Sequence, residues 1–306
     1  INQGFLSLRD IERLVKQNKP IVWTMHDMWP CTGICHHARD CEKFQTECES
    51  CFFLKSKGKD LSTSVFDKKM SLYKDANITF VGCSRWLSGR AKKSYLLRGK
   101  AVLSIPNPID TKVYHPMDQG MARELLGLPS GKRLLLFGAL NVTDKRKGID
   151  YLIEALRRME KQDVELVVFG QVKDDIRGLF PVPIHSMGYL SDESKIVALY
   201  NAVDMFITSS LEENLPNTIM ESMACGTPCV GFEIGGIPEM IDHRVNGYVA
   251  NYKDAGDLAN GIQWVLEHED RLALSDACVK KVQENYTEEV VAKQYTALYE
   301  KLLKGE

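Results

Sequence analysis

The chain lacks any apolar stretch of the length that a membrane-spanning helix needs, about 20 residues, although 44% of its 306 residues are hydrophobic. The sequence therefore predicts no spanning helix. Residues 1–10 contain neither an initiator methionine nor the basic and apolar regions of a secretory signal. We therefore expect residence in the cytoplasm, and the length suits a globular chain of two domains.

The chain also has little net charge, because 39 Lys and Arg face 41 Asp and Glu, a formal total of -2. This balance, and the absence of a recognition motif, argue against a nucleic-acid partner. The total hides an asymmetry, since residues 1–105 carry 18 basic but only 10 acidic residues. Between Cys83 and Ala101 there is no acidic residue, and the basic ones are Arg85, Arg90, Lys92, Lys93, Arg98 and Lys100.

Apolar residues such as Trp86, Leu87 and Tyr95 are interleaved with these basic residues. The composition suits a helix on an anionic membrane surface, or one that faces a phosphorylated acceptor. An ordinary amphipathic surface helix explains it equally well. The segment alone does not decide among these three interpretations.

Strand and helix patterns alternate in two blocks, which are separated by a proline-rich interruption that begins at Pro106. Such alternation predicts a mostly parallel, helix-covered sheet in each block. We expect an N-terminal domain over 1–105, a linker over 106–116 and a C-terminal domain over 117–306. Strands are predicted at 21–25, 78–82, 102–105, 134–138, 164–170, 204–208 and 229–232, and helices at 61–74, 148–159, 192–202 and over most of 255–303.

The most informative stretch is the one from Ser209 to Pro228, which reads as the loop and helix that follow a buried strand. Pro216 suits the first turn of that helix and Gly226 its end. In open α/β sheets ligands bind where such loops leave the strands, and the free amides of a helix start attract anions. Two carboxylates, Glu213 and Glu221, stand in this span with seven residues between them.

A bare pair of this kind is usually a solvated loop residue and an ion-paired helix residue. Here Ser-Ser precedes Glu213, Ala-Cys-Gly-Thr-Pro follows Glu221, and Gly-Gly-Ile-Pro-Glu follows at 235–239. In this context the spacing resembles the Glu-x7-Glu signature of retaining family 4 glycosyltransferases. The resemblance implies the α/β GT-B fold, in which two Rossmann-like domains with parallel sheets face a cleft. Family members have further N-terminal β-α units, so the N-terminal, acceptor-side domain is expected to be incomplete and the chain inactive if truncated.

The resemblance also implies a reaction and a set of donor contacts. A retaining enzyme of the hexosyltransferase class moves a sugar from a nucleotide-diphosphate sugar to an acceptor hydroxyl, without a catalytic metal. By resemblance, Glu213 holds sugar hydroxyls, Glu221 accepts bonds from the ribose, and His26 lies near the transferred sugar. Because Pro216 has no amide hydrogen, backbone contacts to the ligand are expected from residues such as Asn214 and Leu215.

The phosphate site departs from the family pattern. The family places an Arg after the glycine that ends the first strand of the second domain, but here Gly138 is followed by Ala139. Lys147 keeps the expected lysine, and Lys145 or Arg146 is positioned to supply the second charge. A solvated basic loop is the alternative.

Cysteines concentrate in a proposed insert over 31–51, which holds five of the nine. Cys48 and Cys51 form a C-x2-C pair that Cys35 and Cys41 could complete as a tetrahedral, structural zinc site, with His36 or His37 as substitutes. Reduced thiols and disulfides remain the alternatives.

The family resemblance implies a glycan or lipid-linked acceptor, and a role in bacterial surface glycans such as capsule or lipopolysaccharide. The basic first part favours a peripheral position on the inner face of the membrane. Two other functions compete: a nucleotide-sugar epimerase of the same architecture, and a non-catalytic binding protein whose cysteine-rich insert is the functional element.

Overall fold

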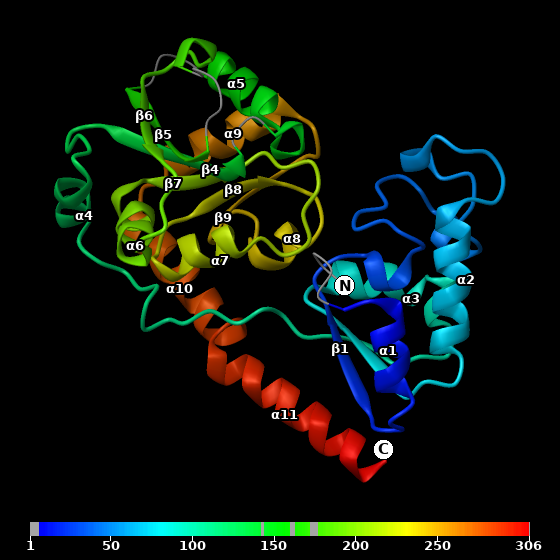
Figure 1. Cartoon of the computed structure of the whole chain (residues 1–306). Coiled ribbons are helices and arrows are strands. Elements are labelled where there is room, and N and C mark those ends of the chain that lie inside the picture. The colour runs from blue at the N-terminus through cyan, green and yellow to red at the C-terminus, as the bar shows by residue number, and fades with distance from the viewer. Residues whose placement is uncertain (1–5, 142–143, 160–162, 172–176, 306) are drawn as a thin grey trace. The chain divides into compact units, whose positions relative to one another are not determined.

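A computed structural model describes residues 6–141, 144–159, 163–171 and 177–305 (Figure 1). The chain divides into two compact units, one of Ile1–Pro106 with Lys293–Glu306 and the other of Asn107–Ala292. The predicted C-terminal domain had included residues 293–306, which instead group with the first unit. The reason is visible in the last helix, where Tyr295 Oη lies 2.9 Å from Thr24 Oγ1 of the first unit.

The first unit contains a parallel sheet with the order β1-β2-β3. Phe80 of the central strand is fully buried and packs against Trp23 and Tyr73, with ring centroids 5.7 and 5.3 Å away. The three strands confirm the prediction from the sequence. The elements are α1 (Leu8–Val15), β1 (Ile21–Met25), α2 (Leu61–Tyr73), β2 (Ile78–Gly82), α3 (Arg85–Lys92) and β3 (Val102–Ser104), with short 3-10 turns η2 to η4 before α2 and η5 after α3.

A buried lysine of α2 organises the loop that follows β1. Lys69 Nζ donates to the carbonyl oxygens of Trp29, Thr32 and Gly33 at 2.6, 2.9 and 3.0 Å. It also lies 3.4 Å from the centroid of the Trp29 ring. Burial lowers the pKa of Lys69 to about 7. One side chain thus fixes the backbone of a loop whose regular structure here is limited to the short 3-10 turn η2 (Trp29–Cys31).

The second unit contains a six-stranded parallel sheet with the order β6-β5-β4-β7-β8-β9. Its elements β4, α5, β5, α6, β7, α7 and β8 confirm the predicted alternation, whereas β6 and β9 were not predicted. The strands are β4 (Arg133–Asn141), β5 (Val164–Gln171), β6 (Ile184–Gly188), β7 (Met205–Thr208), β8 (Cys229–Phe232) and β9 (Gly247–Ala250), and the helices are α4 (Gln119–Leu126), α5 (Ile149–Arg158), α6 (Glu193–Ala202), α7 (Asn217–Ala224), α8 (Ile237–Met240), α9 (Ala255–Leu266) and α10 (Arg271–Asn285). The last helix, α11 (Glu288–Lys304), begins in the second unit and continues into the first.

The strand order reverses its direction at β4. The chain runs outward from β4 to β5 and β6, and then returns to the other side of β4 as β7. Such a switch point leaves a crevice at the carboxyl ends of the two central strands, because their loops diverge to opposite sides. We therefore expect a ligand site at the loops after β4 and β7.

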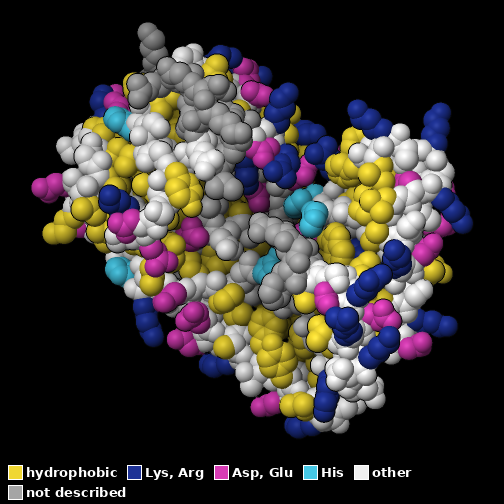
Figure 2. Space-filling model, in the orientation of Figure 1, with side chains coloured by type: hydrophobic (Ala, Val, Ile, Leu, Met, Phe, Trp, Pro, Cys, Tyr) yellow, Lys and Arg dark blue, Asp and Glu magenta, His cyan; other side chains and the backbone are white. Residues whose placement is uncertain are grey.

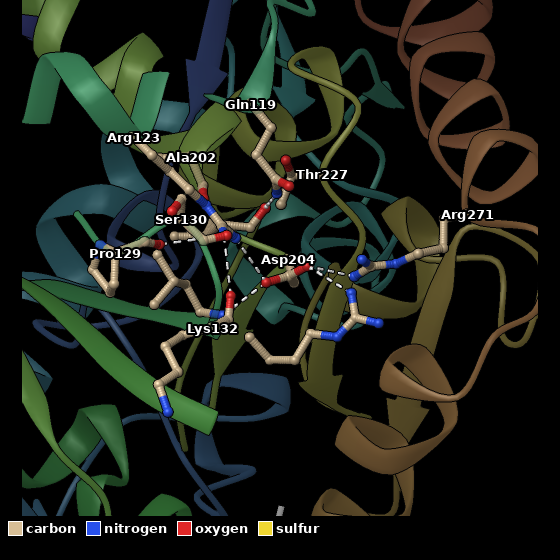
Figure 3. Close-up of polar contacts among 12 residues, drawn as sticks. Gln119, Arg123, Pro129, Ser130, Lys132, Ala202, Asp204, Thr227 and Arg271 are labelled. Carbon is tan, nitrogen blue, oxygen red and sulfur yellow. Dashed lines mark hydrogen bonds and ion pairs between the residues drawn. The ribbon is translucent and has the colours of Figure 1, made fainter. Parts of the chain in front are cut away.

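At the opposite end of the same strands, a buried carboxylate ties four elements together (Figure 3). Asp204 Oδ2, just before β7, accepts bonds from Arg123 Nη2 of α4 at 3.0 Å and from the amide of Leu134 in β4 at 2.7 Å. Its other oxygen lies 2.5 Å from Arg271 Nη2 of α10. Arg123 also donates to the carbonyls of Ala202, Pro129, Ser130 and Lys132. This network anchors β4 beside β7.

The described residues contain no helix that is both long enough and apolar enough to cross a membrane.

Candidate functional site

The loop after β7 is held against the loop after β4 by backbone contacts. The amide of Leu211 donates to the carbonyl of Arg146 at 2.7 Å, and Ser209 Oγ donates to the carbonyl of Lys147 at 3.0 Å. Gly148 makes this approach possible, since a Cβ atom there would lie 1.9 Å from Ser209 O and its φ is +64°. The two loops at the switch point are therefore in direct contact.

A second glycine contact holds the same loop from the other side. A Cβ atom on Gly235 would lie 2.0 Å from the carbonyl oxygen of Glu213, and the φ of Gly235 is +60°. The amide of Gly236 donates to the carbonyl of Asn214 at 2.6 Å. The Gly-Gly motif thus helps to hold the backbone of the loop at Glu213 in place.

These contacts bring together two of the predicted site residues. Lys147 Nζ lies 2.5 Å from Glu213 Oε1, and the two side chains are 32% and 14% exposed. Both groups remain accessible to solvent. A ligand's phosphates can therefore bind the Lys147 ammonium, and its hydroxyls can donate to the Glu213 carboxylate. Arg146 is arranged differently, because its guanidinium already pairs with Asp144, with Nη2 and Oδ2 2.6 Å apart.

Glu221 lies in α7, the helix that follows the Glu213 loop. The helix begins after Pro216 and ends before Gly226, as predicted. The carboxylate accepts a bond from Tyr200 Oη of α6 at 2.7 Å. Burial raises the pKa of Glu221, the neighbouring charge of Glu193 adds to that rise, and the Tyr200 bond opposes it. A partly buried carboxylate with one oxygen fixed can use the other to accept a ligand's hydroxyl groups.

Comparison with known proteins identifies this part of the chain. Residues 131–268 match the family model described as glycosyl transferases group 1. This part of the chain is similar to that family, and the matched residues make up a little less than half of the 306-residue chain. The match covers the region in which Lys147, Glu213 and Glu221 lie.

Curated relatives of the chain cover overlapping regions. The N-acetyl-alpha-D-glucosaminyl L-malate synthase of Bacillus anthracis is 24% identical over 213 residues, which are 68% of this chain and 55% of that protein. The N,N'-diacetylbacillosaminyl-diphospho-undecaprenol alpha-1,3-N-acetylgalactosaminyltransferase of Campylobacter jejuni is 33% identical over 118 residues, 38% of this chain and 31% of that protein. The chain thus spans about half the length of the first curated relative it matches, and less of the second.

Solved structures show that the chain has the GT-B fold. Anabaena HepE in complex with UDP has a TM-score of 0.74 at 17% identity, over 96% of this chain and 77% of that one. Sucrose-phosphate synthase from Thermosynechococcus elongatus has a TM-score of 0.70 at 21% identity, over 93% of this chain and 68% of that one. The GT-B prediction is confirmed.

The remaining predicted site residues lie in different surroundings. Asn214 and Leu215 are each 7% exposed, so their side chains belong to the interior and only their backbone can serve a ligand. Gly138 has a packing reason to be a glycine, because the Phe169 ring occupies the place of a Cβ atom, 1.8 Å away. His26 lies exposed in the first unit, just after β1.

Sequence reasoning missed Tyr200 altogether. This tyrosine is fully buried, and both burial and the nearby Glu221 raise its pKa. It stands 21 residues before Glu221 and in another helix, so no local spacing pointed to it. Its hydroxyl fixes which oxygen of Glu221 stays available.

The cysteine-rich insert brings its predicted ligands near one another. Burial, together with the thiols of Cys51, Cys48 and Cys41, raises the pKa of Cys35 to about 12. The amide of Gly33 donates to Cys48 Sγ at 3.3 Å, and none of the nine cysteines, all of which the structure describes, forms a disulfide. Within the described residues, however, no group of three or more His, Cys, Asp or Glu side chains is arranged to hold a metal ion. The insert is thus a thiol cluster here, and zinc stays a prediction from the sequence.

Metal analysis of the purified chain tests the zinc prediction. If Cys35, Cys41, Cys48 and Cys51 hold zinc, we expect about one zinc ion per chain, and a chelator should lower the melting temperature because a structural ion stabilises only the folded state. Cys278→Ser, a change outside the cluster, should leave the metal content unchanged. If the chain contains no metal and melts at the same temperature with and without chelator, the zinc prediction is wrong and the cysteines are reduced thiols.

Proposed function

We propose that the protein is a glycosyltransferase, which moves a sugar from a nucleotide-diphosphate sugar to an acceptor hydroxyl with retention at the anomeric carbon. The observation that carries the proposal is the meeting of Lys147 and Glu213 at the switch point, with Glu221 fixed by Tyr200 on the next helix. The UDP complex of HepE supports a nucleotide-diphosphate donor by analogy of fold. A ligand with a diphosphate and many hydroxyls fits this combination of one cation and two carboxylates.

Each group has a role in the proposed reaction. Glu221 accepts bonds from the ribose, Glu213 binds sugar hydroxyls, and His26 is the first-unit residue assigned to the sugar. When the bond from the anomeric carbon to the phosphate oxygen breaks, Lys147 stabilises the charge that develops on the departing diphosphate. The acceptor oxygen attacks from the same face, and its proton passes to the departing phosphate oxygen. The chemistry needs no metal.

The acceptor is proposed from the relatives. The Campylobacter relative is named for an undecaprenol-linked substrate, and the Erwinia amylovora relative for amylovoran biosynthesis. These names support a glycan or lipid-linked acceptor. We further propose a role in bacterial surface glycans such as capsule or lipopolysaccharide, and a peripheral position on the cytoplasmic face of the membrane.

Two measurements test the proposal. Calorimetry with a panel of UDP- and GDP-sugars should find one that binds the 306-residue chain at a single site. Acceptor-dependent release of the nucleotide diphosphate, measured in the full-length protein, then distinguishes transfer from epimerisation, which changes the sugar and releases no diphosphate. A chain that binds none of the panel would contradict the proposal.

Donor affinity is expected to fall on acidification. Glu221 accepts ribose bonds best when ionised, and its pKa lies above the ordinary value of 4.5. As the pH falls through that raised pKa the carboxylate takes up a proton, so binding weakens by up to about tenfold per pH unit. Titration with a nucleotide sugar from pH 8 downward measures this, since its diphosphate diester does not titrate there. Glu221→Gln should bind weakly at every pH; an equally steep fall in that variant would assign the titration to another group.

A further inference from the structure

The first unit carries a solvent-facing group of large apolar side chains beside its cysteine-rich insert. Phe52, Phe53 and Leu54 form the 3-10 turn η4 (Phe52–Leu54) and are 68%, 45% and 39% exposed. Figure 2 shows hydrophobic side chains gathered at the upper end of this unit, with Lys and Arg side chains around them. We call residues 52–59 the aromatic tip. Consecutive exposed residues of this size mark an interaction surface.

The charge of the aromatic tip has one sign. Lys55, Lys57 and Lys59 are all exposed, and residues 52–59 include no Asp or Glu. Arg39 adds a fourth cation, with its guanidinium carbon 5.3 Å from the centroid of the Phe53 ring. Apolar rings bordered by cations match an anionic, apolar partner.

The frame of the aromatic tip prevents its rings from folding back into the core. The amide of Ser50 donates to the carbonyl of Gly58, and the amide of Gly58 to Ser50 Oγ, each at 2.8 Å. The amide of Cys51 donates to Asp60 Oδ2, also at 2.8 Å. Both ends of the tip are therefore fixed, and its rings are held in solvent before any partner arrives.

The basic segment between Cys83 and Ala101 does not offer an apolar surface of this kind. Leu87, Leu96 and Leu97 are no more than 4% exposed, so most of the apolar residues that suggested a membrane helix lie in the core. Arg90 pairs with Glu42, and Lys100 donates to the carbonyls of residues 74 and 76. The ordinary amphipathic surface helix is the interpretation that fits these contacts.

We propose that the aromatic tip docks the protein on an anionic phospholipid bilayer. Phe52 and Phe53 would enter the boundary between headgroups and acyl chains, while the lysines would contact lipid phosphates. Single, short insertions of this size bind reversibly, which suits a peripheral enzyme. The inference deepens the proposed function, because a lipid-linked acceptor gives the docking its purpose, but vesicle binding is measured without any reaction.

Vesicle sedimentation of the 306-residue chain tests the proposal. The probes are vesicles of phosphatidylcholine alone and of phosphatidylcholine with phosphatidylglycerol. We expect binding to the anionic vesicles at low salt, little binding to the neutral ones, and loss of binding at about 1 M salt, where the Debye length is about 3 Å. If the chain does not bind anionic vesicles even at low salt, the proposal is overturned, and a protein or glycan partner is indicated instead.

Variants locate the contact on the protein. Phe52→Ser with Phe53→Ser should lower the affinity for anionic vesicles at least tenfold, and Lys55→Gln with Lys57→Gln and Lys59→Gln about 100-fold at low salt. Met121→Ser with Leu125→Ser is the matched apolar control, because these α4 residues are 68% and 63% exposed.

Lys92→Gln with Lys93→Gln is the charge control, since both lysines are exposed residues of the competing basic segment. If the two controls weaken binding as much as the tip variants do, the aromatic tip is not the docking element. Calorimetry with the nucleotide sugar separates this result from the proposed function. The tip variants should bind donor normally, and a failure of donor binding in the wild type would leave the vesicle result standing.

Discussion

Asp204→Ala is expected to lower the free energy of unfolding by about 3–5 kcal/mol, the usual effect of removing one partner of a buried ion pair. The Asp204 side chain is 1% exposed and that of Arg123 is 6% exposed, so the substitution leaves a guanidinium charge uncompensated in the interior. It also removes the acceptor of the Leu134 amide. Urea unfolding followed by circular dichroism measures the change.

Asp163→Ala is the matched control for this loss. Asp163 forms a 2.5 Å ion pair with Lys132, but its side chain is 73% exposed, so its removal should cost well under about 1 kcal/mol. Asp204→Asn, which can still accept from the Leu134 amide, should fall between the two. If Asp204→Ala and Asp163→Ala unfold at the same urea concentration, the network does not anchor β4 and β7.

Glu221→Ala is expected to weaken binding of the nucleotide sugar about 100-fold. A hydrogen bond to a charged group contributes roughly 1.5–3 kcal/mol, and the ribose offers two hydroxyls. Calorimetry with the donor found in the panel gives the ratio directly. The dissociation constant should rise, while the stoichiometry should stay at one donor per chain.

Tyr200→Phe separates binding from packing in this experiment. The variant removes the bond that fixes one Glu221 oxygen but leaves the carboxylate in place, so it should weaken donor binding by only about fivefold. If Glu221→Ala binds the donor as tightly as the wild type, Glu221 is not a donor contact. The non-catalytic reading, in which the cysteine-rich insert is the functional element, would then gain support.

The sequence predicted the elements whose signals are local. β7 is an unbroken buried run, and Pro216 and Gly226 mark the two ends of α7, so the strand, loop and helix around Glu213 follow from neighbouring residues. β6 was not predicted, because it is an edge strand whose five residues are all partly exposed or exposed, which leaves no apolar run to detect.

Contacts between distant segments decide the rest. Nothing near Glu221 points to Tyr200, and nothing near Asp204 points to Arg123, 81 residues earlier. Tyr295, in the segment 293–306 that groups with the first unit, likewise contacts Thr24, 271 residues earlier. Such pairs are set by how helices and strands pack, which periodicity and spacing along the chain do not report.

The same distinction applies to the basic first part of the chain. Its composition suggested a membrane contact in the segment from Arg85 to Lys100, but burial of Leu87 and Leu97 removes the apolar half of that surface. Phe52 and Phe53 carry a much weaker signal in the sequence, because two adjacent aromatic residues are more often buried. Only their exposure, beside three lysines, points to the aromatic tip.

The central claim is that Lys147, Glu213 and Glu221 form one nucleotide-sugar site. A crystal structure of the chain with the nucleotide sugar that binds in calorimetry tests it most directly. We predict ribose hydroxyls within hydrogen-bond distance of the Glu221 carboxylate, the diphosphate beside Lys147, and a Glu213 side chain that has exchanged its 2.5 Å contact with Lys147 for sugar hydroxyls. A nucleotide bound away from the loops after β4 and β7, with that ion pair intact, would contradict the account.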